Sequence, residues 1–204
     1  MKYFIAIVAI ISLNLLVNHM PESSDILVAD IVTVQHLFEP KDTEIYLEGI
    51  PIPVRLYPFG EVAAHDTAGR AGFVIFVEPE QHVYQSDNLL RITPNFDTPQ
   101  HLPDNFMEII QIANITVDEA ESYIKAAFDI NSYRYSFYTA PTEAFPFSII
   151  EFYDGIEFDS KSTRILIKDN NHNGVFVITV QNSVESVAFW VRCKHYIGTL
   201  SIIG

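Results

Sequence analysis

The chain has 204 residues and a strongly acidic balance, with 26 Asp and Glu against 12 Lys and Arg and a formal net charge of −14. Nucleic acids and anionic membrane surfaces are bound through Lys and Arg. A chain with this negative charge is therefore expected to bind neither of them. The hydrophobic share of 49% is typical of a globular protein, and because Cys193 is the single cysteine, no disulfide can form within the chain.

Residues 1–20 have the pattern of a secretory signal peptide. Lys2 gives a short positive start, and an almost unbroken apolar run follows from Tyr3 to Val17. This run is shorter than the roughly 20 residues that a helix needs to cross a bilayer. We therefore predict a secreted protein whose mature chain, residues 25–204, is one β-rich domain without a membrane span. An uncleaved signal anchor and a buried N-terminal element are the alternatives, and the cleavage site stays open.

The chain from residue 26 to residue 60 is predicted to be β. Residues 26–35 are rich in β-branched side chains and should form the first strand, and residues 43–48 alternate between apolar and polar side chains. The next stretch contains Pro51, Pro53 and Pro58. Because proline has no N–H to donate to a ladder, we predict an edge strand that resists unwanted pairing. A polyproline-like surface segment or a docking surface is the alternative.

The middle of the chain contains two further apolar runs, at 71–80 and 82–93, each predicted to form one strand. A loop with three prolines follows at 94–103, and it is the predicted place of a subdomain break if the domain divides. Residues 105–113 fit a short helix or a strand, and the sequence leaves both open.

Residues 117–128 are the one segment that we predict to be helical. Thr116 and Glu119 have the spacing of a capping box, in which each side chain bonds a backbone N–H of the other. Apolar side chains recur behind them at helical spacing, and Glu121 and Lys125 are placed to pair on the exposed side. The predicted helix is therefore amphipathic, with a well-defined start.

A sequon for N-glycosylation begins at Asn114, just before this helix. In a secreted eukaryotic protein we predict that Asn114 is exposed and carries a glycan. The motif also occurs by chance, so an unmodified asparagine is the alternative.

Residues 133–138 are predicted to form a strand with an aromatic face. We interpret its Tyr133, Tyr135 and Phe137 as core packing, with stacking on sugar rings as the alternative. Residues 148–159 are then predicted to form a hairpin, in which Asp154-Gly155 supplies a two-residue type I′ turn.

Three acids surround this predicted hairpin, namely Glu151, Glu157 and Asp159. Glu157 and Asp159 are two residues apart, so they project from the same face of their strand. Two carboxylates on one face are what a glycosidase requires. In a chain this acidic we favour the simpler interpretation of a solvated strand face.

Residues 164–204 are predicted to be a β-meander, because short runs rich in Val, Ile and Phe are separated by clusters of turn residues. The segment Asp169 to Gly174 matches the first half of an EF-hand loop, but Val180 stands where a bidentate glutamate is needed. We interpret the segment as a hairpin turn and predict no metal. The weak candidates for calcium ligands are Asp169, Asn171 and Asn173.

Cys193 and His195 are predicted to share a strand face within this meander. A thiol–imidazole pair is then sterically feasible, but no signature of a catalytic cysteine surrounds it. We interpret Cys193 as a buried, small apolar residue, with an intermolecular disulfide as the alternative in an oxidising compartment.

These observations predict a mainly β fold, an antiparallel sandwich or open barrel with one short helix at 117–128. The sequence has no Walker loop, dinucleotide fingerprint or G-x-S-x-G motif, so we assign no catalytic residue and no cofactor. The predicted function is that of a secreted, acidic, non-enzymatic interaction or structural protein with a protein or glycan partner. The alternatives are an extracellular carrier of a small apolar ligand and a carbohydrate-active hydrolase.

Overall fold

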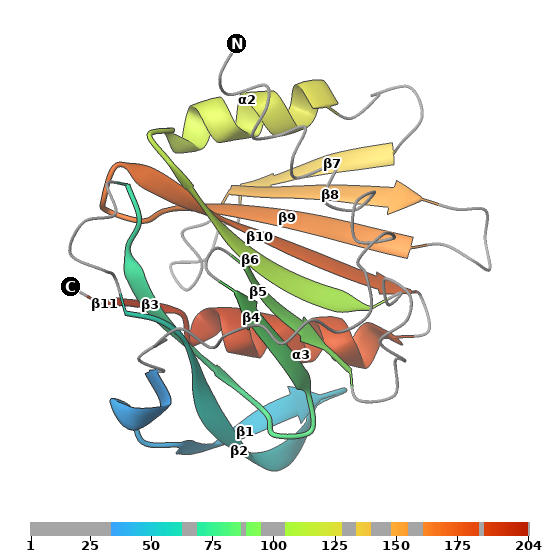
Figure 1. Ribbon diagram of the computed structural model, residues 1–204. Helices are drawn as coiled ribbons and strands as arrows, with labels where there is room; N and C mark the ends of the chain where they lie inside the picture. Colours follow the sequence, from blue (N-terminus) through green and yellow to red (C-terminus); the bar gives the residue numbers. More distant parts are fainter. Residues whose placement is uncertain are drawn as a thin grey trace, which may run out of the picture.

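The computed structural model describes residues 34–62, 69–86, 89–94, 105–127, 134–139, 148–154, 161–183 and 186–203. Within them the chain forms two antiparallel sheets and two α-helices, which confirms the mainly β fold (Figure 1). The small sheet has the order β1-β2-β3-β11, and the large sheet has the order β4-β5-β6-β10-β9-β8-β7.

The elements have the following bounds. The strands are β1 (Lys41–Leu47), β2 (Ile50–Glu61), β3 (Gly72–Val77), β4 (His82–Ser86), β5 (Leu89–Thr93), β6 (Phe106–Ala113), β7 (Arg134–Thr139), β8 (Ser148–Asp154), β9 (Lys161–Asp169), β10 (Gly174–Ser183) and β11 (Ser201–Ile203). The helices are the 3-10 helix η2 (Val34–His36) and the α-helices α2 (Val117–Ala127) and α3 (Val187–Gly198).

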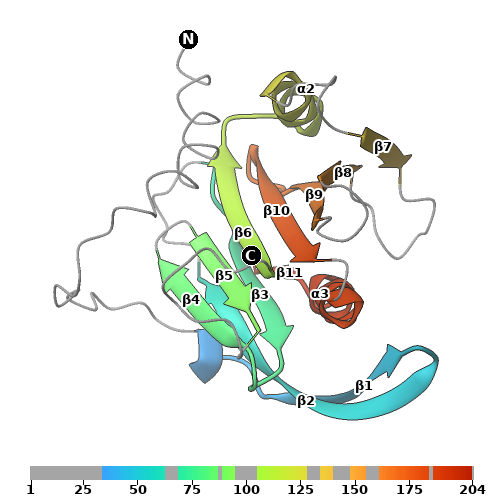
Figure 2. The same cartoon turned by 90° about the vertical axis from the view of Figure 1, so that its right-hand side faces the viewer.

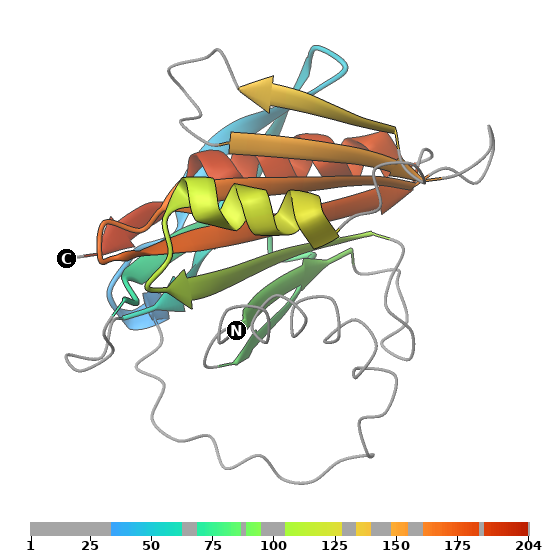
Figure 3. The ribbon, with the colours of Figure 1, turned by 90° about the horizontal axis from the view of Figure 1, so that it is seen from above.

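The large sheet is covered on both faces at β10, and this explains why the sequence of β10 is almost continuously apolar. Val175 and Val177 pack with α2 on one face, whereas Phe176 and Ile178 belong to the core on the other face. Successive side chains of a strand point to opposite faces, so both sets of positions must be apolar. Figure 2 shows the consequence, with α2 and α3 on opposite sides of the large sheet. Seen from above, α2 lies over β9 and β10 (Figure 3).

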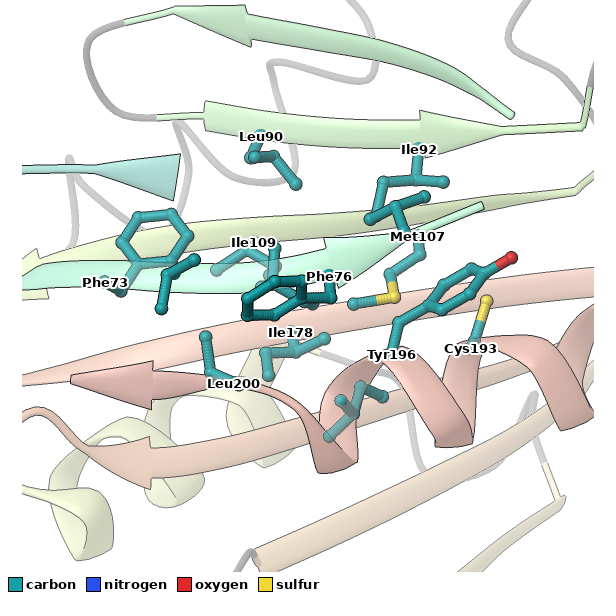
Figure 4. Close-up of a cluster of buried hydrophobic side chains, with 14 of the residues drawn as sticks. Phe73, Phe76, Leu90, Ile92, Met107, Ile109, Ile178, Cys193, Tyr196 and Leu200 are labelled. Atoms are coloured by element: carbon teal, nitrogen blue, oxygen red, sulfur yellow. The ribbon is translucent and has the colours of Figure 1, made fainter. Parts of the chain in front are cut away.

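The main core lies between the large sheet, the small sheet and α3 (Figure 4). Phe73 of β3 and Phe176 of β10 meet edge to face, with ring centroids 5.4 Å apart and an interplanar angle of 72°. Met107 and Tyr196 are both 0% exposed, and Figure 4 shows the tyrosine ring directed from α3 toward the methionine. Full burial of a large apolar side chain contributes about 1.5–3 kcal/mol, so this core is the main source of stability.

Helix α2 confirms the predicted helix and its capping box. The backbone N–H of Glu119 donates to Thr116 Oγ1 over 3.3 Å, and the N–H of Thr116 donates to Glu119 Oε2 over 2.9 Å. The hydrogen bonds also lower the pKa of Glu119, because they favour its charged form. Glu121 and Lys125 pair as expected, with Nζ and Oε2 3.3 Å apart.

Helix α3 corrects the predicted meander, because residues 187–198 are helical where a strand was expected. Its buried residues are Phe189, Cys193, Tyr196 and Ile197, and their spacing places them on one side of a helix. The Val, Phe and Trp residues of the segment are good strand formers, but burial of this helical face outweighs local propensity. Cys193 and His195 therefore do not share a strand face, and two positions two apart on a helix do not face each other.

Three smaller expectations are also corrected. Residues 82–93 form two paired strands, β4 and β5, in place of one. Asp154 pairs with Lys161 in the register of β8 and β9, which does not fit a two-residue turn at Asp154-Gly155. Residues 34–36 form η2 and not the end of a strand, while residues 26–33 lie outside the described part of the chain.

The remaining expectations concern residues 71–80, 105–113 and the loop at 94–103. The first contains β3, and the second, which the sequence left open, is the strand β6. Most of the loop lies outside the described residues, but the strands before and after it, β5 and β6, pair directly in one sheet. The division into domains stays a prediction.

Candidate interaction surface

The β1–β2 hairpin is exposed along one of its sides. Leu47 and Ile50 are opposite each other, so Glu48 and Gly49 form a two-residue turn, with φ of 52° and 82°. Two positive φ values are the mark of a type I′ turn, whose twist matches that of the flanking strands. Figure 2 shows the hairpin extending as a curved arm away from the rest of the small sheet.

The inner side of the hairpin anchors it to the main core. Ile45 is 2% exposed and Leu56 is 1% exposed, and both belong to the core that contains α3. The ammonium group of Lys41 lies 3.9 Å from the ring centroid of Phe76, a cation–π contact that ties the start of β1 to β3. The hairpin is therefore held in a defined position.

The outer side of the hairpin is exposed, and we call it the hairpin face. It consists of Asp42, Glu44 and Tyr46 of β1 together with Pro51, Pro53, Arg55 and Tyr57 of β2. Tyr46 is 59% exposed and Tyr57 is 37% exposed, and at the tip Ile50 is 65% exposed. The face thus combines rigid prolines and charges with aromatic rings and an arginine, two residue types that are enriched in protein–protein interfaces.

Two weak polar contacts order the hairpin face. Tyr46 donates its hydroxyl to Glu44 Oε2 over 3.1 Å, and the Glu44 carboxylate raises the pKa of Tyr46 by accepting that hydrogen bond. Arg55 and Asp42 form an exposed ion pair, with Nη1 and Oδ1 3.6 Å apart. Exposed pairs of this kind contribute little to stability, so both partners remain available to bind another molecule.

The predicted edge strand is confirmed for half of β2 and corrected for the other half. Among the described strands, residues 50–56 pair only with β1, whereas residues 57–61 pair with β3. Pro51 and Pro53 lie in the first half, where β2 has one open side, and Pro58 lies in the second. The edge strand of the small sheet is β1. Which strand would lie outside β2 could not be predicted, because it depends on pairing between distant segments.

The metal candidates and the sequon, distant in sequence, meet at one end of the large sheet. Asn173 donates through Nδ2 to Asn114 Oδ1 over 2.9 Å, and the N–H of Asn114 donates to the carbonyl oxygen of Asn173 over 2.7 Å. Asp169 Oδ1 accepts from the N–H of Asn171 over 2.5 Å. These groups hold the turn together, which agrees with its interpretation as a hairpin turn.

The buried side chain of Asn170, which is 0% exposed, anchors the same turn. Its Nδ2 donates to the carbonyl oxygen of Gly69 over 2.9 Å and to Gln111 Oε1 over 3.2 Å. Among the described residues, no group of three or more His, Cys, Asp or Glu is placed to hold a metal ion. The calcium alternative therefore gains no support from carboxylate clustering.

Cys193 lies in the main core and is 0% exposed, the arrangement expected of a cysteine that acts as a small apolar residue. Burial raises the pKa of its thiol well above the ordinary value, so the reactive thiolate is disfavoured. A disulfide to another chain would require that α3 move away from the core.

A buried polar cluster that the sequence did not reveal fixes α3 to β3. Glu78 is 5% exposed, and its Oε2 accepts from the Tyr196 hydroxyl and from Arg192 Nε, the latter over 3.0 Å. Burial and then the Glu78 carboxylate raise the pKa of Tyr196, so its hydroxyl remains a donor. Because every member is engaged in packing α3, we interpret this cluster as structural.

A small pocket lies next to the ion pair of Arg70 and Glu61, whose Nη2 and Oε2 atoms are 2.8 Å apart. Its cavity volume is about 10 Å³, which is room for about one water molecule. Sites for small organic ligands have volumes of about 300 Å³ or more. This pocket therefore does not support the carrier alternative.

The acids considered for a hydrolase are only partly described. Glu151 lies opposite Arg164 in the register of β8 and β9, while Glu157 and Asp159 lie outside the described residues. Tyr135 and Phe137 lie on β7, the edge strand of the large sheet, and Tyr133 lies outside the described residues. The hydrolase and sugar-stacking alternatives stay untested predictions. No helix in the described residues has the length and apolar character needed to cross a bilayer.

Comparison of the sequence with protein families gives no match, and comparison with curated proteins gives none either. Among solved structures, the chain is similar to a protein from Bacteroides thetaiotaomicron VPI-5482 whose crystal structure has a resolution of 1.50 Å. The two share 11% sequence identity over 65% of this chain, with a TM-score of 0.43. The chain spans 45% of the length of that protein. A likeness of this size carries no argument about function.

Proposed function

We propose that the chain is a secreted, acidic, non-enzymatic interaction protein and that it binds a protein partner through the hairpin face. The observation that carries this proposal is the exposure of Tyr46 and Tyr57 beside Pro51 and Pro53 on an arm that extends from the molecule. Exposed aromatic side chains are enriched where proteins bind each other, because they bury a large area on contact.

The rigidity of the arm favours binding. Type I′ geometry at Glu48-Gly49, the prolines of β2 and the buried anchors Ile45 and Leu56 all limit the conformations of the hairpin. A surface that is ordered before contact loses less conformational entropy on binding. The backbone of the hairpin face is therefore ordered before it meets a partner.

The charge of the protein indicates the kind of partner. Asp42 and Glu44 lie on the hairpin face, Glu48 lies in its turn, and the whole chain has a net charge of −14. Opposite charge accelerates association and like charge excludes wrong partners. We therefore propose a partner segment rich in Lys and Arg, whose binding weakens as salt concentration rises.

The binding proposal is tested by panning a random peptide display library on the full chain. We expect enriched peptides with several Lys or Arg residues, and synthetic copies of them should bind the Tyr46→Ala/Tyr57→Ala double variant roughly tenfold or more weakly. The matched control is Tyr84→Ala, because Tyr84 is 47% exposed on β4 of the other sheet. Failure to enrich any peptide, or equal losses in both variants, would overturn the proposal.

Secretion and modification need a separate measurement, which is expression in a eukaryotic secretory cell followed by mass spectrometry. We expect a secreted chain that has lost its first 20 or so residues and carries a glycan on Asn114. Support for the glycan comes from the exposure of Asn114, whose hydrogen bond to Asn173 uses Oδ1 and leaves the amide nitrogen available. A chain that begins at Met1 and stays in the cell would contradict the proposal.

A further inference from the structure

We infer that the outer edge of β1 binds an extended, Lys- or Arg-bearing segment of the partner as an additional β-strand. This inference rests on the proposed function and specifies how the hairpin would recognise its partner. Strand addition supplies affinity through main-chain hydrogen bonds, and alternate side chains supply specificity.

The two open sides of the hairpin differ, and this difference carries the inference. On β2, Pro51 and Pro53 lie in the segment whose only pairing strand within the described ranges is β1. The pair Leu47–Ile50 closes the two-residue turn and is hydrogen-bonded, so the pairs made by Pro51 and Pro53 are non-hydrogen-bonded. Their missing N–H groups would point away from β1, and the prolines therefore block the open side of β2.

The open side of β1 has no such block. By the same alternation, the N–H and C=O groups of Asp42, Glu44 and Tyr46 point outward, and β1 contains no proline. Among the described residues, no strand pairs with this side and no other backbone group bonds to it. Three donors and three acceptors thus point outward from β1 without a backbone partner among the described residues, whereas Pro51 and Pro53 remove the donors on the open side of β2.

The side chains of this edge identify the occupant. An antiparallel second copy of β1, centred on its middle residue, would place Glu44 opposite Glu44 of the copy, and both chains are strongly acidic. Like charges directly opposite each other destabilise a strand pair, and opposite charges stabilise it. A foreign strand with Lys or Arg on the side of Asp42 and Glu44 fits the edge better than a second copy does.

The decisive variant is Glu44→Pro, which removes one outward N–H. Glu44 lies opposite Pro53, at a non-hydrogen-bonded pair, so the substitution leaves the bonds between β1 and β2 intact. Glu44→Gln is the control for charge, because it keeps the N–H. Thermal unfolding of each variant checks the fold.

The probe is the set of synthetic Lys- and Arg-rich peptides enriched on the full chain. We expect Glu44→Pro to weaken their binding roughly tenfold or more, and Glu44→Gln to weaken it less. Peptides with N-methylated backbone positions provide a second test on the unmodified chain: methylation of alternate residues should abolish binding. This test still applies if Glu44→Pro does not fold.

Other outcomes separate this inference from the proposed function. If Glu44→Pro and N-methylated peptides bind normally while the tyrosine double variant does not, the face binds by side chains alone and the inference is overturned. If none of these changes affects binding, both proposals fail. Self-association of the chain that Glu44→Pro abolishes would make a second copy the occupant and would also overturn the inference.

Discussion

The two α-helices in the described part of the chain are similar in length but are held in place in different ways. Helix α2 lies on the outer face of the large sheet and begins with a complete capping box. Helix α3 lies between the large and small sheets, and its N-cap residue Ser186 makes no side-chain capping bond. Local hydrogen bonds thus define α2, whereas burial among distant strands defines α3.

The largest test of this difference is truncation of the matched tyrosines Tyr196 and Tyr123. Tyr196→Ala in α3 should lower the free energy of unfolding by about 3–5 kcal/mol, because the side chain is 0% exposed. Tyr123→Ala in α2 should cost less, because Tyr123 is only partly buried. Urea denaturation measures both values, and equal losses would contradict the deeper anchoring of α3.

Tyr196→Phe isolates the hydroxyl from the ring. The phenylalanine keeps the packing but removes one of the two donors to the buried Glu78 carboxylate. We expect a loss of about 1–3 kcal/mol in the free energy of unfolding. A loss as large as that of Tyr196→Ala would show that the hydrogen bond, and not the packing of the ring, anchors α3.

The N-cap residues of the two helices provide a smaller test, in which the larger loss of stability is expected in α2. Thr116→Ala removes the side-chain cap of α2 and should cost about 1 kcal/mol. Ser186→Ala should change the free energy of unfolding very little, since no capping bond is lost. A larger effect at Ser186 than at Thr116 would reverse the comparison.

The smallest expected effect is a difference in pH dependence. Burial lowers the pKa of His195 in α3 below its ordinary value of 6.5, so the native state favours the neutral ring. The unfolded chain then binds more protons between the two pKa values, and stability falls as pH falls below 6.5. The lowered pKa of Glu119 in α2 gives a loss that begins only below its ordinary value of 4.5.

Thermal unfolding of His195→Gln and Glu119→Gln against the parent chain, across acid and neutral pH, separates these windows. The histidine variant should differ in slope near neutral pH, and the glutamate variant only in acid. The same slope for His195→Gln and the parent from pH 6.5 downward would argue against the lowered pKa of His195.

The sequence predicted those parts of the fold whose signals are local. The alternation of β1, the capping box at Thr116 and the pair of Glu121 and Lys125 are all confirmed, because each depends on residues a few positions apart. The helix α3 was missed for the opposite reason. Its buried positions follow helical spacing, but only the sheets around it decide that this spacing prevails over the strand propensity of its residues.

The candidate site was predicted less well than the fold. The prolines of β2 indicated an edge or a docking surface, but the open edge of β1 depends on which strands pair, and this is not a local property. The contact between Asn114 and Asn173 joins residues 59 positions apart and follows from the register of β6 and β10. The cluster of Glu78 with Tyr196 spans 118 positions and had no sequence signal.

The pairing of β11 with β3 has a consequence for the order of folding. The N–H of Phe76 donates to Thr199 Oγ1, 123 residues further along the chain. The strand β11 follows Thr199 in sequence and pairs with β3. Contacts this distant in sequence form slowly, because a long loop must close first. During synthesis the apolar strand β3 emerges long before α3 and β11, so until they arrive it is a segment that chaperones would protect from aggregation.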